Sequence, residues 1–253
     1  MNNDIFSLTG KIALITGGAK GIGLGISRVL CRAGASVIVI GRDKEALTQA
    51  SAELGEQMTY RVFDLSKRTQ IPDLINEIHD VHGKIDILIN NAGVHLKKKI
   101  IETNDRDLDD LINTNLLSVF SLTRECVNKM IEQQSGSIIF ISSMAALFGI
   151  ENVSAYGASK AALKGVMQNL VAEVSKYNIR INTIAPGWIE TEMLIKAVKN
   201  DPIRKSKITQ RIALSGYGSP EDIGNATLFL CSEASRYITG IVMPVDGGAS
   251  INF

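Results

Sequence analysis

Short apolar runs alternate with longer segments of helical periodicity along most of the chain. The clearest runs lie at 12–15, 37–40, 85–89, 138–141 and 181–184, and they are rich in Ile and Val. Their apolar residues do not alternate with polar ones, which is typical of parallel strands covered on both faces. Weaker runs at 58–63 and 241–245 predict two further strands.

Between the runs lie segments with the apolar spacing of amphipathic helices. They cover approximately 21–33, 43–54, 67–82, 104–133, 155–177 and 219–232. Strand and helix alternate, which indicates βαβ units with right-handed crossovers. The pattern predicts an α/β, Rossmann-like, doubly wound parallel sheet of about seven strands with helices on both faces. No repeat or linker composition interrupts it, so residues 1–253 are expected to form a single domain.

One segment, 187–218, does not follow this alternation. It contains Gly187, Pro202, Gly216 and many charged residues. It is too long for an ordinary connection, and long loops in compact domains are usually functional. We expect one or two short helices that form a lid over a binding site.

Charge and composition exclude several classes of partner. The 253 residues include 27 Lys and Arg and 26 Asp and Glu, a net charge of +1. Nucleic acid and anionic membrane surfaces both require a basic surplus, so neither is an expected partner. No run of about 18 apolar residues predicts a membrane span.

The cysteines indicate a reducing compartment, and the histidines do not indicate a metal site. Cys31, Cys126 and Cys231 are scattered, which fits the cytosol rather than a disulfide framework. The first residues lack the features of a signal peptide, so a cytoplasmic location is expected. His79 and His82 have a spacing that can bind metal, but no other His or Cys is near them in the sequence. A solvated helix end is the favoured interpretation, and no metal site is predicted.

A glycine-rich turn follows the first predicted strand. The sequence Thr16-Gly-Gly-Ala-Lys-Gly-Ile-Gly23 has the spacing Gly-x-x-x-Gly-x-Gly. Glycines between a strand and a helix let the backbone approach a phosphate, and the helix N-terminus supplies N–H groups. A tight turn without a ligand is the alternative. The candidate cofactor contacts are Gly17, Lys20, Gly21, Ile22 and Gly23.

The end of the second strand bears on the choice of cofactor. Gly41, Arg42 and Asp43 follow it, and in this fold that position meets the adenosine ribose. An acidic residue there selects NAD, whereas Arg accommodates a 2′-phosphate. Arg42 together with Lys20 favours NADP(H) over NAD(H). The alternative is a solvated Arg42 beside Asp43 as a helix N-cap.

Tyr156 and Lys160 form a Tyr-x-x-x-Lys pair one helical turn apart, on one face of a predicted helix. By itself this is a weak signal, because an exposed Tyr beside a Lys gives the same pattern. Ser142 and Ser143 end the fifth predicted strand, at the carboxyl edge where open α/β sheets bind ligands. A phenol, an ammonium and a hydroxyl are thus predicted near one cofactor site.

These motifs together resemble the short-chain dehydrogenase/reductase family. Residues 16–23, Asn90-Asn91-Ala92-Gly93, Asn115, Ser143, the Tyr156/Lys160 pair and Pro186-Gly187 stand in the family's order and spacing. The resemblance extends from Leu8 to the terminal Val245-Asp246-Gly247-Gly248. It implies an NAD(P)-dependent dehydrogenase or reductase that interconverts a carbonyl and a secondary alcohol, and commonly a homotetramer.

The resemblance also implies roles for individual residues. Tyr156 is the general acid or base, Lys160 lowers its pKa and holds the nicotinamide ribose, and Ser143 binds the substrate oxygen. Asn115 positions a water, with Asn113 as a rival assignment. Further implied cofactor contacts are Asp64, Leu65, Asn91, Ala92, Gly93, Pro186, Gly187, Ile189 and Thr191. The candidate substrate contacts are Ser143, Tyr156, His95, Met144, Val153, Trp188 and Met193.

Several substrate classes remain open. The chain resembles 3-oxoacyl-(acyl-carrier-protein) reductases, but the two arginines that those enzymes use to dock the carrier correspond to Gln134 and Tyr177. Its opening residues 4–11 and the basic run 97–99 resemble gluconate 5-dehydrogenases, and that run is either an attractor for an anionic substrate or a solvated loop. A broad carbonyl reductase is the third class. A catalytically idle NADP-binding sensor is the remote alternative, because binding alone does not need the Tyr156 phenol.

Overall fold

The computed structural model describes residues 4–199, 201–214 and 216–252. Its seven strands are all parallel and form one sheet in the order β3-β2-β1-β4-β5-β6-β7. Their bounds are β1 Ile12–Thr16, β2 Ser36–Gly41, β3 Met58–Val62, β4 Ile87–Asn90, β5 Gly136–Ile141, β6 Ile179–Pro186 and β7 Val242–Val245. The predicted Rossmann-like sheet is confirmed. The strand order reverses between β1 and β4, and ligands bind at such a reversal in open α/β sheets.

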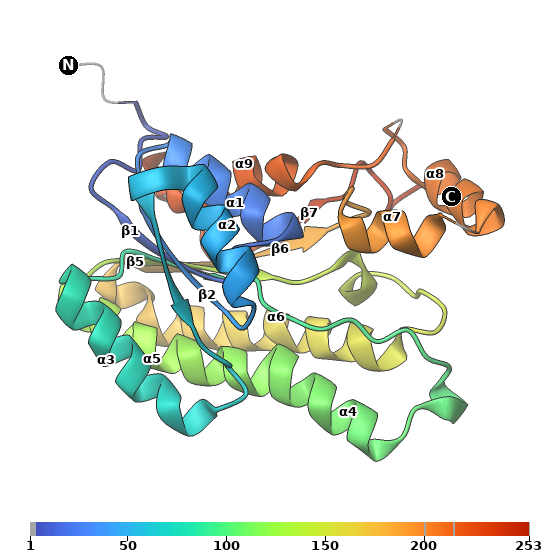
Figure 1. The fold of residues 1–253 in the computed structure, drawn as a ribbon, viewed down its shortest axis with the longest axis horizontal. Coiled ribbons are helices and arrows are strands. Elements are labelled where there is room, and N and C mark those ends of the chain that lie inside the picture. The colour runs from blue at the N-terminus through green and yellow to red at the C-terminus, as the bar shows by residue number, and fades with distance from the viewer. Residues whose placement is uncertain (1–3, 200, 215, 253) are drawn as a thin grey trace.

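Helices cover both faces of this sheet (Figure 1). One face carries α1 (Gly21–Arg32), α2 (Lys44–Leu54) and α9 (Pro220–Cys231). The other carries α3 (Ile71–His82), α4 (Asp105–Ile112), α5 (Ser118–Gln133) and α6 (Ser154–Val174). Each face has its own buried apolar cluster, and neighbouring β1 residues point to opposite clusters, which explains why the strands do not alternate with polar residues. No helix in the described ranges is long and apolar enough to cross a membrane.

Two predicted elements differ in detail from the structure. The helix predicted over 104–133 contains one π-helical turn, Asn113–Leu117, between α4 and α5. The fourth strand begins at Ile87 rather than at residue 85. Asp86 uses its carboxylate to accept a hydrogen bond from the Ile12 N–H at 2.8 Å, and it forms an ion pair with Lys84 at 3.0 Å. Through these contacts Asp86 fixes the residues that precede β4 and is not itself part of the strand.

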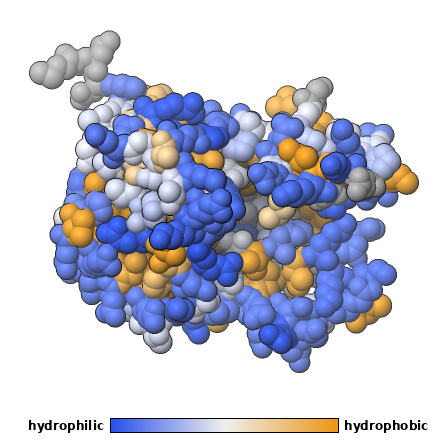
Figure 2. All heavy atoms as spheres, viewed as in Figure 1, coloured by the Kyte–Doolittle hydropathy of each residue, from blue (hydrophilic) through white to orange (hydrophobic). Residues whose placement is uncertain are grey.

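The segment 187–218 forms two short helices, α7 (Glu192–Val198) and α8 (Pro202–Arg211), as expected. Its two ends are tied by a parallel bridge between Ile189 and Gly218. Val198, Ile208, Ile212 and Ala249 form a small separate apolar cluster. This unit and α4 border a notch in the molecule (Figures 1 and 2), and apolar side chains gather in that notch.

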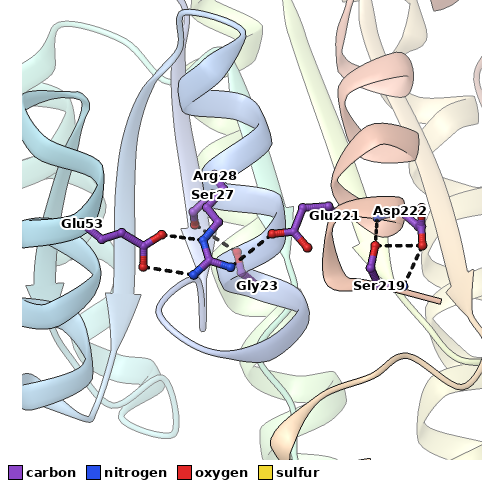
Figure 3. Close-up of polar contacts among 7 residues, drawn as sticks. All are labelled: Gly23, Ser27, Arg28, Glu53, Ser219, Glu221 and Asp222. Carbon is purple, nitrogen blue, oxygen red and sulfur yellow. Dashed lines mark hydrogen bonds and ion pairs between the residues drawn. The ribbon is translucent and has the colours of Figure 1, made fainter. Parts of the chain in front are cut away.

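Helices α1 and α9 cross at close range, which ties the end of this segment to the glycine turn. A Cβ at Gly25 would lie 2.5 Å from the Pro220 backbone, so the crossing requires glycine. Arg28 of α1 binds both oxygens of Glu53 in α2, at 2.5 and 3.0 Å, and Glu221 in α9 at 3.1 Å (Figure 3). Ser219, directly after the 187–218 segment, caps α9 by accepting from the Asp222 N–H. The start of α9 is therefore held against α1.

Candidate active site

The glycine turn between β1 and α1 has the geometry of a phosphate cradle. Gly17 and Gly21 have φ angles of +65° and +51°, in the left-handed region that favours glycine. A Cβ at Gly23 would overlap the Gly17 carbonyl oxygen and lie 2.6 Å from Asn91 Nδ2. Lys20 is the N-cap of α1 and makes no side-chain capping bond, so the first N–H groups of α1 are available to an anion. These residues fit the pyrophosphate of a dinucleotide.

Thr16 and Asn91 join the carboxyl ends of β1 and β4 at the point where the strand order reverses. The Thr16 hydroxyl accepts from the backbone N–H groups of Asn91 and Ala92, at 3.0 and 2.9 Å. Asn91 Nδ2 donates to the carbonyls of Thr16 and Gly17, at 3.0 and 3.1 Å. The resemblance implied that Asn91 meets the cofactor; its side chain here braces the glycine turn, a role that the sequence did not reveal.

Two cations lie at the end of β2, but neither is isolated from acidic groups. Lys20 Nζ forms an ion pair with Asp43 Oδ2 at 2.6 Å. Asp43 also caps α2, because its other oxygen accepts from the Ala46 N–H at 3.1 Å. Arg42 is exposed. The pKa of Asp64 is lowered mainly by the Ser66 backbone N–H, and the Arg42 charge adds to this. Leu65, beside Asp64, is half-buried against the core.

The π-helical turn places Asn115 in the interior. Its side chain is completely buried. Asn115 Oδ1 accepts from the Val94 N–H at 2.8 Å, and Nδ2 donates to the Val94 carbonyl at 2.9 Å and to Ser159 Oγ at 3.0 Å. Ser159 in turn donates to the Tyr156 carbonyl at 2.8 Å. Asn115 therefore connects the loop after β4 to the helix that carries Tyr156. Ser159 was missed as a linking residue, although its position three residues after Tyr156 on the same helix was a usable signal.

Lys160 is buried, and its ammonium is held by the backbone. Its Nζ donates to the Ile141 carbonyl at 2.9 Å, and the Ser142 hydroxyl donates to the Lys160 carbonyl at 2.9 Å. A Cβ at Gly93 would lie 3.1 Å from both Lys160 Nζ and Asn115 Oδ1, so these two polar groups converge on Gly93. Burial lowers the pKa of Lys160 to about 8. A fraction of this lysine is thus neutral near physiological pH.

Tyr156 lies between Ser143 and His95. Ser143 lies close enough to the Tyr156 hydroxyl to affect its pKa, and Ser143 Oγ accepts from the Ala145 N–H at 3.1 Å. The rings of His95 and Tyr156 have centroids 4.6 Å apart and are tilted by 52°. Burial raises the pKa of Tyr156, and the nearby Ser143 side chain offsets part of that rise. The sequence led us to expect a pKa lowered by Lys160; in this arrangement burial prevails and the phenol is neutral at physiological pH.

We expect Lys160→Met to abolish turnover and to stabilise the fold by about 1–2 kcal/mol at pH 7, because it removes a buried charge. The Lys160 pKa is about 8 in the folded state, against 10.5 for an unperturbed lysine side chain. The unfolded chain therefore holds more protons between these pH values, and the wild-type free energy of unfolding rises with pH across them.

Urea titrations of both proteins at pH 7 and near pH 10 test this prediction. The difference in unfolding free energy is expected to shrink at the higher pH. A difference that stays the same at both pH values would contradict a cost due to the buried charge.

The end of β6 and the start of α7 face the glycine turn. A Cβ at Gly187, just after Pro186, would lie 2.6 Å from the Asp246 Cα, so this approach requires glycine. Thr191 caps α7 by accepting from the Leu194 N–H at 3.3 Å. Its methyl group lies 3.4 Å from the position of a Cβ on Gly21. Ile189 is buried in the bridge to Gly218. Of these four candidate cofactor contacts, the structure thus places Thr191 directly against the glycine turn.

The candidate substrate contacts divide into two groups. His95 and Ser143 adjoin Tyr156, and the buried Met144 and Val153 belong to the segment between Ser143 and Tyr156. Trp188 packs instead on the apolar cluster of the 187–218 segment, and Met193 is 67% exposed on α7. The structure therefore brings the first group to the phenol and does not show the second group there.

The basic run 97–99 does not act as one patch. Lys98 forms an ion pair with Asp107 at 2.5 Å, and Lys99 with Glu102 at 3.5 Å. Burial lowers the pKa of the His95 ring most, and the positive charges of Arg204 and Lys97 lower it further. Lys97 is therefore close enough to His95 to act on it. One face of the His95 ring is covered by Tyr156 although the residue is exposed overall.

Across the parts of the chain that the structure describes, no group of three His, Cys, Asp or Glu residues is arranged to hold a metal ion.

Comparison with known proteins agrees with this geometry. Residues 17–250 match a family model described as enoyl-(acyl carrier protein) reductase. The 3-oxoacyl-[acyl-carrier-protein] reductase FabG of Thermotoga maritima is 36% identical over 247 residues, which cover 96% of this chain and 99% of that protein. The chain belongs to the short-chain dehydrogenase/reductase family. It is an oxidoreductase that uses a nicotinamide cofactor, as the sequence predicted.

Other members of the family extend the likeness. Carbonyl reductase family member 4 of Xenopus tropicalis is 35% identical over 241 residues, which cover 95% of this chain and 98% of that protein. The structure of a gluconate 5-dehydrogenase from Burkholderia cenocepacia, in complex with NADP and tartrate, superposes with a TM-score of 0.93. It is 32% identical and covers 99% of each chain. The fold of this dehydrogenase/reductase is thus shared along its whole length.

Proposed function

We propose that the protein interconverts a carbonyl compound and a secondary alcohol with NADP(H), and that Tyr156 is its general acid and base. The observation that carries this proposal is the convergence of Lys160 and Asn115 on Gly93, together with a buried phenol beside the Ser143 hydroxyl. A site that only binds a cofactor has no need of a buried phenol beside a second hydroxyl. This argues against a catalytically idle sensor.

Each residue of the site has a distinct role in this proposal. When bound, the nicotinamide cofactor donates or accepts the hydride. The raised pKa of Tyr156 keeps its phenol neutral, so it can donate a proton to the substrate oxygen during reduction. Ser143 donates a hydrogen bond to that oxygen. Lys160 stabilises negative charge on the phenol by its own positive charge. Asn115 holds the loop after β4 against α6, the helix that carries Tyr156.

NADP(H) is favoured over NAD(H) because Lys20 and Arg42 lie at the end of β2, where the adenosine ribose is expected. The related gluconate 5-dehydrogenase holds NADP. The remaining contacts follow from position: the glycine turn for the pyrophosphate, Asp64 and Leu65 for the adenine, Ala92 and Gly93 for the ribose, and 186–191 for the nicotinamide. The segment 187–218 is proposed as the substrate lid; of its residues, Asn200 and Ser215 lie outside the described ranges.

The charges around His95 favour a substrate that carries an acid group. Lys97 and Arg204 both act on the His95 ring, which contacts Tyr156. Two cations near the phenol attract a carboxylate, as in a sugar acid. The carrier-protein alternative draws support from the sequence relatives. Against it, Gln134 and Tyr177 leave the corresponding docking positions without an arginine.

We propose further that the protein is a homotetramer and that it is located in the cytoplasm. Leu108 of α4, Leu117 of the π-helical turn and Phe120 of α5 expose apolar side chains, which suits burial in a homotetramer. Light scattering that shows a monomer at micromolar concentration would contradict this. All three cysteines are free and buried, which fits the cytoplasm.

The proposal is tested by an assay of NADPH and NADH oxidation with neutral ketones, a 3-oxoacyl thioester and 5-ketogluconate. We expect turnover with NADPH, and a kcat/KM for the acid that exceeds that for a neutral ketone of similar size by about tenfold or more, since one favourable charge contact contributes about 1.4 kcal/mol. Faster turnover of the thioester would favour the carrier-protein class. Binding of NADPH without turnover of any substrate would support the idle sensor instead.

A further inference from the structure

Asp43 directly follows Arg42 and forms an ion pair with Lys20, the other cation of the proposed cofactor site. Its Oδ2 binds Lys20 Nζ at 2.6 Å, while its Oδ1 accepts the Ala46 N–H at 3.1 Å and caps α2. The cap fixes the carboxylate in place, because its backbone partner is part of the helix. Lys20 is thus held by an anion that cannot move far from it.

Acidic groups around Lys20 and Arg42 nearly cancel the positive charge of these two residues. The Asp43 carboxylate raises the pKa of Lys20, and Glu192 and Glu45 add smaller contributions of the same sign. Arg42 in turn lies close enough to Asp64 to influence it. Each cation that the 2′-phosphate of NADP(H) requires therefore already has a carboxylate near it.

We propose that Asp43 limits the preference of this enzyme for NADP(H), because its carboxylate competes with the 2′-phosphate for Lys20. This inference rests on the proposed use of NADP(H). The Lys20 and Asp43 side chains are 69% and 54% exposed, so their ion pair is weak and a phosphate can displace it. A phosphate oxygen bound to Lys20 Nζ would lie within about 6 Å of the Asp43 carboxylate, where two negative charges repel. NAD(H) places no phosphate there and does not meet this repulsion.

The variant Asp43→Asn separates the charge of this residue from its structural role. Asn caps a helix as well as Asp does, so the α2 cap is retained. The amide has almost the same shape and no negative charge. Glu45→Gln is the matched control, since it makes the same change of charge in the first turn of α2 and keeps the Oε1 that accepts from Gln49. Glu45 forms no ion pair with Lys20 within 4.0 Å and acts on it only at longer range.

Isothermal titration with 2′,5′-ADP and 5′-AMP measures the effect of the 2′-phosphate without any turnover. We expect Asp43→Asn to bind 2′,5′-ADP about 3- to 10-fold more tightly than the wild type at low ionic strength, as expected for removing one nearby like charge. Its affinity for 5′-AMP is expected to stay within about twofold, because no phosphate then faces residue 43. Glu45→Gln is expected to give a smaller gain.

The outcomes separate this inference from the cofactor proposal. If the wild type prefers 2′,5′-ADP and Asp43→Asn binds it equally or less tightly, the competition is refuted and Asp43 instead positions Lys20. An equal gain in Glu45→Gln would also overturn the inference, because general charge would then explain it. If the wild type binds 2′,5′-ADP no more tightly than 5′-AMP, the proposed preference for NADP(H) fails, and this inference fails with it.

Discussion

Replacing Tyr156 with Phe is expected to lower kcat about 1000-fold, while the Kd for NADPH stays within about twofold. The change removes only the phenolic hydroxyl, which lies beside Ser143 and whose pKa is raised by burial. The ring remains to pack on His95 at a centroid distance of 4.6 Å. Proton transfer to the substrate oxygen is lost, whereas the cofactor contacts of the glycine turn are untouched.

Tyr237→Phe is the matched control for this variant. Tyr237 is 100% exposed, so loss of its hydroxyl should leave both kcat and folding unchanged. The measurements are the absorbance of the reduced nicotinamide during turnover and a fluorescence titration with NADPH. Turnover near the wild-type rate in Tyr156→Phe would contradict the assignment of the general acid. Loss of NADPH binding would instead show that Tyr156 is needed to form the cofactor site.

Replacing Gly23 with Ala is expected to weaken NADPH binding about 10- to 100-fold and to destabilise the fold by about 1–3 kcal/mol. The new Cβ would overlap the Gly17 carbonyl and approach Asn91 Nδ2 to 2.6 Å. Neither neighbour moves freely, because Asn91 Nδ2 is bonded to the carbonyls of both Thr16 and Gly17. The strain is therefore transmitted to the junction of β1 and β4, which forms the cradle.

Gly165→Ala provides the corresponding control. Gly165 is an exposed residue in α6, and a Cβ there meets no atom within 4 Å. Alanine is expected to leave NADPH binding unchanged and to stabilise the helix by up to about 1 kcal/mol. Thermal unfolding and a fluorescence titration report both effects. Wild-type affinity in Gly23→Ala would show that the cradle tolerates a side chain and is not the phosphate site.

The fold was accessible from the sequence because its signals are local. Apolar runs such as 12–15 and 37–40 are buried on both faces of the sheet, and the helical segments between them have one apolar stripe each. Tyr156 and Lys160 were also predictable as a pair, since helix geometry alone puts residues four apart on one face. Ser143 could be placed beside them because strand ends gather at one edge of a parallel sheet.

Other features of the site depend on contacts between distant segments. The local pattern at 104–133 does not indicate a π-helical turn. Asn115 in this turn forms side-chain hydrogen bonds with Val94 and Ser159, which belong to other segments of the chain. The basic run 97–99 appeared uniform, but Asp107 and Glu102 take two of its three lysines. Val94 and Ser159 become neighbours of Asn115, and Asp107 of Lys98, only when the chain is folded, whereas Lys99 and Glu102 are three residues apart and form a local pair.

The sequence by itself determined the parallel sheet and the glycine turn, because periodicity and short-range spacing encode them. The proposed reacting groups came from the resemblance of several motifs to one family. Tertiary structure decided which of those groups are charged, buried or already paired. Burial by surrounding elements sets the pKa of Lys160 to about 8 and raises that of Tyr156. The approach of β2 to the glycine turn gives Lys20 its partner Asp43. Such properties arise from the summed environment of each group, which no local segment of the chain contains.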